Sequence, residues 1–286
     1  MEKTKGILYI ILSACSFGIM PILAKLSYKG GANTYTTLFL RFFFAAIMLF
    51  YYLKSKEISL KLSNKQIFLV LIIGIFGFTF TTSSLFMSYN YISIGMASMI
   101  FFTYPAIVTL LSYLLYKERI YPRKIISLII SLIGLYILID CGSVTFNLKG
   151  IVLAGMAALL YSFYVLGASH KEFKKINSYV LTFYISCASA VVTFIAANAT
   201  RNFNVNISFY ALVAILLLAF ISTVVALMAF LEGVRIIGPS KASIFSTIEP
   251  IVGLMLGTLI LGEPISSRII IGSIMIVTSV IILTKE

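Results

Sequence analysis

Long apolar segments recur along this chain and determine its fold class. Windows of about 20 residues with few charges, long enough to span the hydrocarbon core of a bilayer as helices, follow one another with short connections. Hydrophobic residues make up 60% of the 286 positions and charged residues 11%, whereas a soluble domain is roughly half apolar and a quarter charged. Because such a chain cannot hide its apolar surface from water, the sequence predicts an all-α membrane protein without a soluble domain.

We expect ten transmembrane helices in a single bundle, since the connections between the apolar segments are short. The expected spans cover about 6–26, 33–53, 66–90, 94–116, 122–140, 150–168, 178–197, 207–231, 239–261 and 266–284.

The net charge of +13 is distributed by side of the membrane. One side receives the N-terminus, the even-numbered connections and the C-terminus, and it carries 16 of the 22 Lys and Arg residues. The other side carries Lys25, Lys29, Lys149, Arg201 and Arg268. Because positive residues stay in the cytoplasm, both termini are predicted to be cytoplasmic, in a multi-pass protein of the inner or plasma membrane. The basic charge indicates topology and not a nucleic-acid partner.

The second half of the chain repeats the first. Under a shift of 145 residues, "ASMIFFTYPAIVTLLSYLLYKERIYPR" (97–123) aligns without a gap with "ASIFSTIEPIVGLMLGTLILGEPISSR" (242–268). Pro105 then meets Pro250, and Glu118 meets Glu263. The repeat therefore divides the chain into residues 1–143 and 144–286, each with five expected helices.

Small residues follow the same repeat along one face of the third and eighth expected helices, where they allow close helix packing. They are Gly74, Gly77, Thr81, Ser84 and Ser88 in the first half and Ala219, Ser222, Ala226, Ala229 and Gly233 in the second.

An odd number of helices per repeat makes the second half enter the membrane from the opposite side. Inverted repeats of this kind build many secondary transporters, which hold substrate near the midplane between the two halves. Two such halves can exchange conformations and open the site to each side in turn. The alternative is a duplicated scaffold that transports nothing.

The repeated motifs are similar to those of a known family. "PAIVTLLSYLLYKERI" (105–120) and "EPIVGLMLGTLILGEPI" (249–265), with Phe17-Gly18 and Arg41, resemble the drug/metabolite transporter superfamily, in particular its EamA-type permeases. The resemblance covers essentially the full length. It implies a secondary transporter of small metabolites, often an amino-acid exporter, without ATP-binding parts and coupled to protons or a counter-substrate. Relatives often carry Trp at the first-helix aromatic position, where this chain has Phe17.

Glu249 and Pro250 interrupt the apolar segment 239–261. Glu249 lies about nine residues into it, roughly 13 Å deep and near the bilayer midplane. A carboxylate there costs about 2.5–3.5 kcal/mol, so we expect it to face the interior or a wet cavity. Burial favours the protonated form, which suits a proton carrier, and Pro250 frees a backbone carbonyl. Substrate contact or coupling, and a structural bond to a neighbouring helix, both stay open.

Arg41 is the other deep charge, about eight residues into the segment 33–53 and roughly 12 Å from its outer end. Its charge is permanent and needs an anion or carbonyl groups as partners. One hypothesis pairs it with Glu249, directly or through substrate, and another has it clamp a substrate carboxylate with two hydrogen bonds. The alternative is a side chain that reaches outward to the membrane surface.

Aromatic and kinked positions extend the candidate site. In the repeat, Tyr104 takes the position of Glu249, and Tyr161 takes that of Phe17. Rings from such equivalent helices could line one shared cavity. Candidate gating or kink positions, where a helix can bend, are Gly18, Pro21, Pro105 and Pro250. Bends of this kind also occur in static membrane bundles.

Hydroxyl groups are concentrated in the segment 77–91. Thr81, Ser84 and Ser88 share the small-residue face of the third helix, and Ser243 belongs to the repeated motif of the second half. We include these four among the substrate-binding candidates. The alternative is that they bond helix carbonyls within tightly packed interfaces.

Enzymatic and metal chemistry have little support in the sequence. The three cysteines, Cys15, Cys141 and Cys187, are scattered and lack metal-ligand spacing, and no nucleophile–base set or phosphate-binding glycine loop is evident. We expect no cofactor, no metal and no enzyme activity, with a small molecule and lipids as partners. A membrane enzyme for lipid-linked substrates, or a receptor that does not transport, are the alternatives from other classes.

Overall fold

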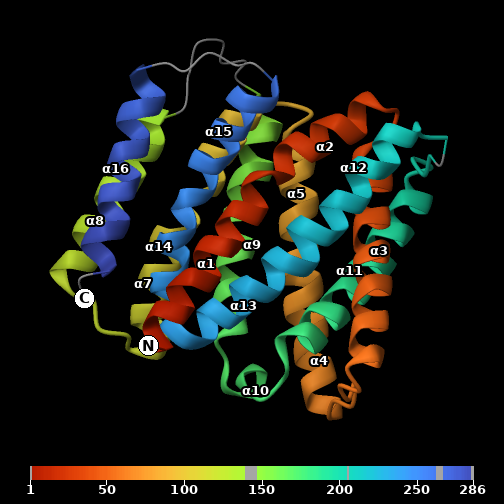
Figure 1. The fold of residues 1–286 in the computed structure, drawn as a ribbon, viewed down its shortest axis with the longest axis horizontal. Coiled ribbons are helices and arrows are strands. Elements are labelled where there is room, and N and C mark those ends of the chain that lie inside the picture. The colour runs from red at the N-terminus through yellow and green to blue at the C-terminus, as the bar shows by residue number, and fades with distance from the viewer. Residues whose placement is uncertain (1, 139–146, 205, 262–266, 285–286) are drawn as a thin grey trace.

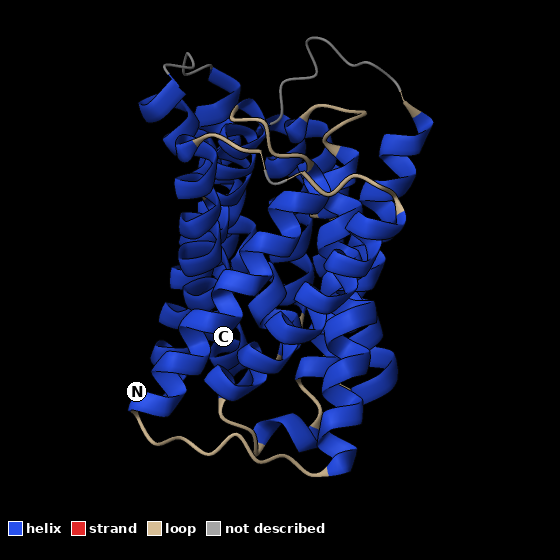
Figure 2. Cartoon of the chain, turned by 90° about the vertical axis from the view of Figure 1, so that its right-hand side faces the viewer, coloured by secondary structure: helices blue, strands red, loops and turns tan. Residues whose placement is uncertain are grey.

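The computed structural model describes residues 2–138, 147–204, 206–261 and 267–284 as a bundle of helices (Figure 1). Figure 2 shows helices and loops, and no strand, in these ranges. The elements are α1 (Glu2–Gly18), α2 (Met20–Lys29), α3 (Thr34–Ser55), α4 (Asn64–Ile72), η1 (Ile73–Thr79), α5 (Phe80–Ser88), α6 (Ile94–Phe101), α7 (Tyr104–Tyr116), α8 (Pro122–Leu138), α9 (Leu148–Ala168), α10 (Lys171–Lys174), α11 (Ser178–Ala199), α12 (Phe209–Ala219), η2 (Phe220–Val225), α13 (Ala226–Ile237), α14 (Pro239–Phe245), η3 (Ser246–Ile248), α15 (Glu249–Leu261) and α16 (Ser267–Thr284).

Side-chain caps fix where several of these helices begin. A helix start leaves backbone N–H groups without partners, and Asn or Ser oxygens accept from them. Asn33 accepts from the backbone N–H of Thr36 at 2.9 Å, and Ser63 forms a reciprocal capping box with Gln66. The other side-chain caps of the long helices are Ser93, Asn147, Asn177 and Ser208.

Eight helical segments in the described part of the chain are long and apolar enough to cross a membrane. The described residues of the expected spans 122–140 and 239–261 are helical too, as α8 and as α14 to α15, but they are not among these eight segments. The all-α membrane fold is therefore confirmed, while the count of ten spans stays a prediction.

Helices of the first half pack against helices of the second in matching pairs. In the repeat, α1 corresponds to α9, and the helix formed by α4, η1 and α5 corresponds to that formed by α12, η2 and α13. Accordingly, α1 packs on α13 of the second half, and the equivalent helix α9 packs on α5 of the first half. In the same way, α1 contacts α15 and α9 contacts α7. The equivalent pairs α8 with α16 and α3 with α11 lie side by side (Figure 1). This pairing brings α1, α9 and the broken helices of both halves to the centre.

Three of the central helices break in the middle of the bundle, each just before a proline. The new helices begin with Met20-Pro21, Tyr104-Pro105 and Glu249-Pro250. Proline has no N–H to give to the preceding turn, and its fixed φ suits the first turn of a new helix. The breaks fall at three of the expected kinks, and Gly18 ends α1. Two of the three first residues, Met20 and Glu249, line the cavity described below.

Two other central helices contain a π-helical turn, η1 in the first half and η2 in the second. In each turn a threonine hydroxyl bonds a carbonyl five residues earlier. Thr79 donates to Gly74 at 2.7 Å, and Thr223 donates to Leu218 at 3.3 Å. A π turn leaves carbonyl groups free for other partners, and such turns occur often at functional sites. The sequence did not predict them.

The small-residue faces contain close contacts between helices. A Cβ atom at Gly77 would lie 2.9 Å from the Tyr164 Cβ and 3.1 Å from its Cα. A Cβ at Gly233 would overlap the end of the Ile10 side chain and lie 3.2 Å from the Gly6 carbonyl oxygen. The glycines therefore set the distances between the central helices.

Gly77→Ala is expected to destabilise the protein by about 1–3 kcal/mol, the usual cost of overpacking a core, because the backbone of α9 must move. Gly155→Ala is the matched control on α9, where the nearest atom to a new Cβ would be 3.9 Å away. Thermal unfolding in detergent measures both variants. Equal unfolding temperatures for the two variants would contradict the predicted close contact.

Candidate functional site

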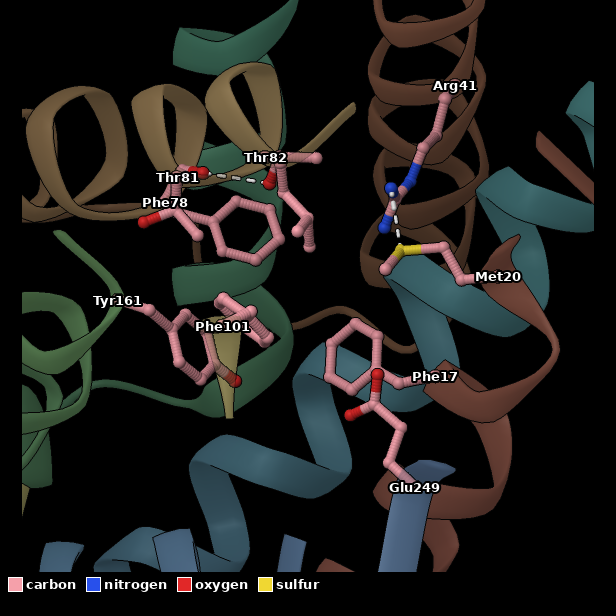
Figure 3. Close-up of a pocket in the computed structure, with 10 residues that line it drawn as sticks. Phe17, Met20, Arg41, Phe78, Thr81, Thr82, Phe101, Tyr161 and Glu249 are labelled. Carbon is pink, nitrogen blue, oxygen red and sulfur yellow. Dashed lines mark hydrogen bonds between the residues drawn. The ribbon is translucent and has the colours of Figure 1, made fainter. Parts of the chain in front are cut away.

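The three helix breaks and the η1 and α5 segments meet around a small cavity (Figure 3). Its volume is about 30 Å³, counted as the space open to the centre of a water-sized sphere. One water needs about 10–15 Å³ on this measure, so the cavity holds a few waters and no metabolite in this conformation. The lining residues are Phe17, Met20, Arg41, Phe78, Thr81, Thr82, Leu85, Phe101, Tyr161 and Glu249.

Arg41 reaches this cavity from the middle of α3 and is fully buried. Its Nε donates to the Thr223 Oγ1 at 2.8 Å and its Nη2 to the Ser222 carbonyl at 2.7 Å. Both acceptors, a side-chain hydroxyl and a backbone carbonyl, belong to η2. Its Nη1 donates to the Met20 Sδ at 3.3 Å. The guanidinium is thus held in a fixed orientation by the second half of the chain.

Two aromatic rings complete the surroundings of this cation. The Arg41 Cζ lies 5.3 Å from the centre of the Phe42 ring and 5.7 Å from that of the Phe86 ring. Such cation–π contacts are strongest where water is excluded. They help to explain how a permanent charge is accommodated in the bundle interior.

Glu249 faces the same cavity from the first position of α15 (Figure 3). In the described part of the chain, its carboxylate makes no hydrogen bond and no ion pair. It interacts with Arg41 electrostatically across the cavity. Arg41 and Glu249 thus line the same small cavity.

The hypothesis that Arg41 and Glu249 pair directly is wrong for this conformation. The ion pairs of the described residues join Lys65 to Glu172, Lys124 to Glu118 and Arg235 to Glu232. Contact through a bound substrate stays a prediction. The alternative of an outward-reaching Arg41 side chain does not hold, because this side chain is fully buried and bonded to η2.

Aromatic rings form the wall on the α9 side. Tyr161 lines the cavity, and its ring centre lies 5.3 Å from that of Phe101 and 4.7 Å from that of Tyr104. Tyr104 is itself 1% exposed and stands behind this wall, outside the cavity lining. Phe17 faces the cavity from the end of α1, next to the Glu249 side chain (Figure 3).

The hydroxyl candidates divide into cavity and packing positions. Thr81 lines the cavity, although its Oγ1 bonds the Gly77 carbonyl of its own helix. Ser88 donates to the Leu85 carbonyl at 2.7 Å, and Ser243 donates to the Ser240 carbonyl at 2.8 Å. These two and Ser84 are buried outside the cavity lining, which favours the packing interpretation for them.

The structure therefore brings together five predicted candidates: Phe17, Arg41, Thr81, Tyr161 and Glu249. The lining residues not predicted are Met20, Phe78, Thr82, Leu85 and Phe101. Met20 could have been found from its place directly before Pro21, because a residue next to a helix break faces irregular backbone. The Thr223 acceptor carried no such signal, because its role depends on the π turn.

A second, larger cavity lies at the end of the bundle where α2 meets α3. It has a volume of about 430 Å³ on the same measure. Tyr28 lines it and also lies within electrostatic range of Arg41. Asn90 donates to the Thr34 hydroxyl, which donates to the Tyr28 oxygen, both at 3.2 Å. This hydrogen-bonded chain links the connection after α5 to α3 and α2 along the wall of the large cavity.

Polar contacts close the opposite end of the bundle, around α10. The Arg235 Nη2 donates to the carbonyl groups of Phe173 and Ile176. Glu232 pairs with Arg235 at 3.2 Å and accepts from the Ser178 hydroxyl at 2.6 Å. Together these bonds tie α13 to the α9–α11 connection.

Comparison with known proteins supports a shared fold and family. A model of the EamA-like transporter family matches residues 4–140 and again residues 148–285. An uncharacterized transporter of Clostridium kluyveri is 25% identical over 97% of this chain and 92% of its own length. An uncharacterized transporter of Archaeoglobus fulgidus is also 25% identical, over 97% of this chain and 95% of its own. A solved crystal structure has a TM-score of 0.85 at 16% identity, covering 99% of this chain and 97% of the other.

Proposed function

Since this chain belongs to the EamA-like transporter family, we propose that it is a secondary active transporter for a small polar metabolite. An amino acid or a related amine is the substrate class that fits the site best. The observation that carries the proposal is the small cavity lined by both Arg41 and Glu249. An amino acid has a carboxylate for the first and an ammonium group for the second.

The aromatic wall supports the same substrate class. Phe17, Phe101 and Tyr161 offer apolar surface beside the two charges, and ring faces also attract ammonium groups. Pockets for small molecules commonly combine mostly apolar walls with a few fixed polar groups. A substrate with two charges and a short apolar side chain suits such a lining.

The proposed mechanism is alternating access between two inverted repeats, residues 1–143 and 144–286. The large cavity at one end and the polar contacts around α10 at the other support a gate on each side of the small cavity. Helix breaks at Pro21, Pro105 and Pro250 supply bending points next to the site. Protons or a counter-substrate drive the cycle in this proposal, and Glu249 is the candidate coupling group.

We propose that the protein lies in the inner or plasma membrane, with both termini in the cytoplasm. The starts of α1 and α10 and the end of α16 lie toward one end of the bundle (Figure 1), which agrees with an even number of spans. The Lys and Arg bias of the connections supports the cytoplasmic side for that end. Export is the proposed direction, and import by the same fold is the second candidate.

A ligand screen tests the proposed site. Detergent-purified protein is heated with amino acids, polyamines, sugars, nucleotides and quaternary amines. A ligand at about 100 times its dissociation constant stabilises by roughly 2.7 kcal/mol. We expect an amino acid or amine to raise the unfolding temperature, and Glu249→Gln to abolish that shift.

Glu2→Gln is the matched control, because this exposed carboxylate at the start of α1 lies outside the cavity. It should leave the ligand shift intact. A stabilising amino acid whose shift survives Glu249→Gln would place the site elsewhere. A screen in which only sugars or nucleotides stabilise would contradict the proposed substrate class.

A further inference from the structure

Arg41 is a buried cation with no anion among its direct hydrogen-bond partners. Within the described residues its partners are a hydroxyl, a backbone carbonyl and the thioether of Met20. A thioether is a weak hydrogen-bond acceptor, whereas a carboxylate or phosphate forms the short, strong bonds for which guanidinium groups are used in proteins. Nη1 is thus the part of this cation with the weakest partner.

Met20 fills space that a ligand group could use. It lines the cavity together with Arg41 (Figure 3), and the remaining volume of about 30 Å³ is too small for a metabolite. A methionine side chain is unbranched and has three rotatable bonds, so it adapts to a new position more easily than Leu or Ile. It is therefore the lining group best suited to leave.

The position of Met20 links this exchange to the backbone. Met20 is the first residue of α2, directly after the break that follows Gly18. On the other side of the break, a Cβ on Gly18 would lie 2.8 Å from the Glu249 carbonyl oxygen, so α1 and α15 touch there. Met20 thus lies two residues from the contact between α1 and the helix that carries Glu249.

We propose that the Met20 thioether holds the place of a substrate carboxylate on Arg41 and is displaced when that carboxylate binds. This inference rests on the proposed function of the cavity and defines its specificity. A carboxylate binds more tightly than the thioether that it replaces, because its hydrogen bond to the guanidinium is stronger. A neutral amide gains less binding affinity from this replacement, and an amine without a carboxylate gains no affinity at Arg41. Met20 is thus a specificity-determining residue that favours anionic groups.

Acetate and acetamide test the exchange, since they are small isosteres that differ in charge. Thermal unfolding of the full chain is followed against each of them, at an ionic strength held constant with the bulkier gluconate. Met20→Ala opens the space and removes the thioether. We expect acetate to bind this variant at least about tenfold more tightly than it binds the original protein. Acetamide should show no comparable gain, and Arg41→Gln added to Met20→Ala should abolish the acetate effect.

Met156→Ala is the matched control, because Met156 is 43% exposed on α9 and lies outside the cavity lining. It should leave acetate binding unchanged. The inference is overturned if acetate binds Met20→Ala and the original protein equally, if acetamide gains as much as acetate, or if the effect survives Arg41→Gln.

Two variants that keep the volume give a second test if Met20→Ala does not fold. Met20→Leu removes the acceptor, and Met20→Gln supplies a stronger one. Acetate should bind most tightly to Met20→Leu, less tightly to the original protein and least tightly to Met20→Gln. Any other order contradicts the exchange. If acetate binds the three proteins in this order but no amino acid or amine binds, only the proposed substrate class is wrong. If amino acids or amines bind in a Glu249-dependent way but acetate does not follow this order, only the proposed displacement of Met20 is wrong.

Discussion

Arg41→Lys is expected to preserve the fold and to reduce transport by about 10- to 100-fold. The guanidinium donates to the Thr223 hydroxyl, to the Ser222 carbonyl and toward the cavity from three different nitrogen atoms. Lys has a single nitrogen and cannot reproduce this planar geometry. Losing one hydrogen bond of a charged group costs about 1.5–3 kcal/mol, and each 1.4 kcal/mol is about tenfold in affinity.

Initial uptake rates at several ligand concentrations measure the effect. Arg201→Lys is the matched control, because Arg201 is exposed in the connection after α11. We expect this control to transport at the original rate. Unchanged transport in Arg41→Lys would contradict a geometric role for the guanidinium. Only the positive charge at this position would then contribute to transport.

Gly18→Ala is the second change with a large expected effect, because it forces apart two of the three helix breaks around the site. The added Cβ would lie 2.8 Å from the Glu249 carbonyl oxygen and 2.8 Å from the Val252 Cβ. Real Cβ atoms do not tolerate such distances, and the backbone oxygen cannot rotate away. We expect a loss of about 1–3 kcal/mol in stability and at least about a tenfold loss of ligand affinity.

The unfolding temperature and ligand titration of the same sample separate the two effects. Gly155→Ala serves again as the control, since its new Cβ has room. A Gly18→Ala protein with original stability and affinity would contradict the close contact of α1 with α15.

Much of the fold could be predicted because its signals are local. Apolar length gives the spans, and the Asn33 and Ser208 side chains that cap α3 and α12 lie within a residue or so of the expected starts. The breaks at Pro105 and Pro250 follow from proline chemistry at those positions. The repeat predicted which helices are equivalent, and the family model matches both halves.

The π turns could not be predicted, because their stability depends on partners from other helices. Ser222 and Thr223 are ordinary small and β-branched residues in the sequence, and their oxygens become acceptors because Arg41 of α3 lies opposite. The equivalent turn η1 has different partners, since its Thr79 hydroxyl bonds the Ser189 hydroxyl of α11 at 2.7 Å.

The charged part of the candidate site was easier to predict than the apolar part. Arg41 and Glu249 stand out because ionisable residues deep in a membrane segment are costly. Phe101 and Leu85 look like any core residue in the sequence. Tyr104 was expected opposite Glu249 by symmetry, but it packs behind Tyr161, because equivalent backbone positions carry side chains of different size.

Uptake of a labelled ligand from the screen into proteoliposomes tests the central claim most directly, with Glu249→Gln measured beside the original protein. The proposed transporter predicts protein-dependent accumulation that requires a coupling gradient or internal counter-substrate and falls to background in Glu249→Gln. Accumulation in Glu249→Gln equal to that of the original protein would contradict the central role of the Arg41–Glu249 cavity.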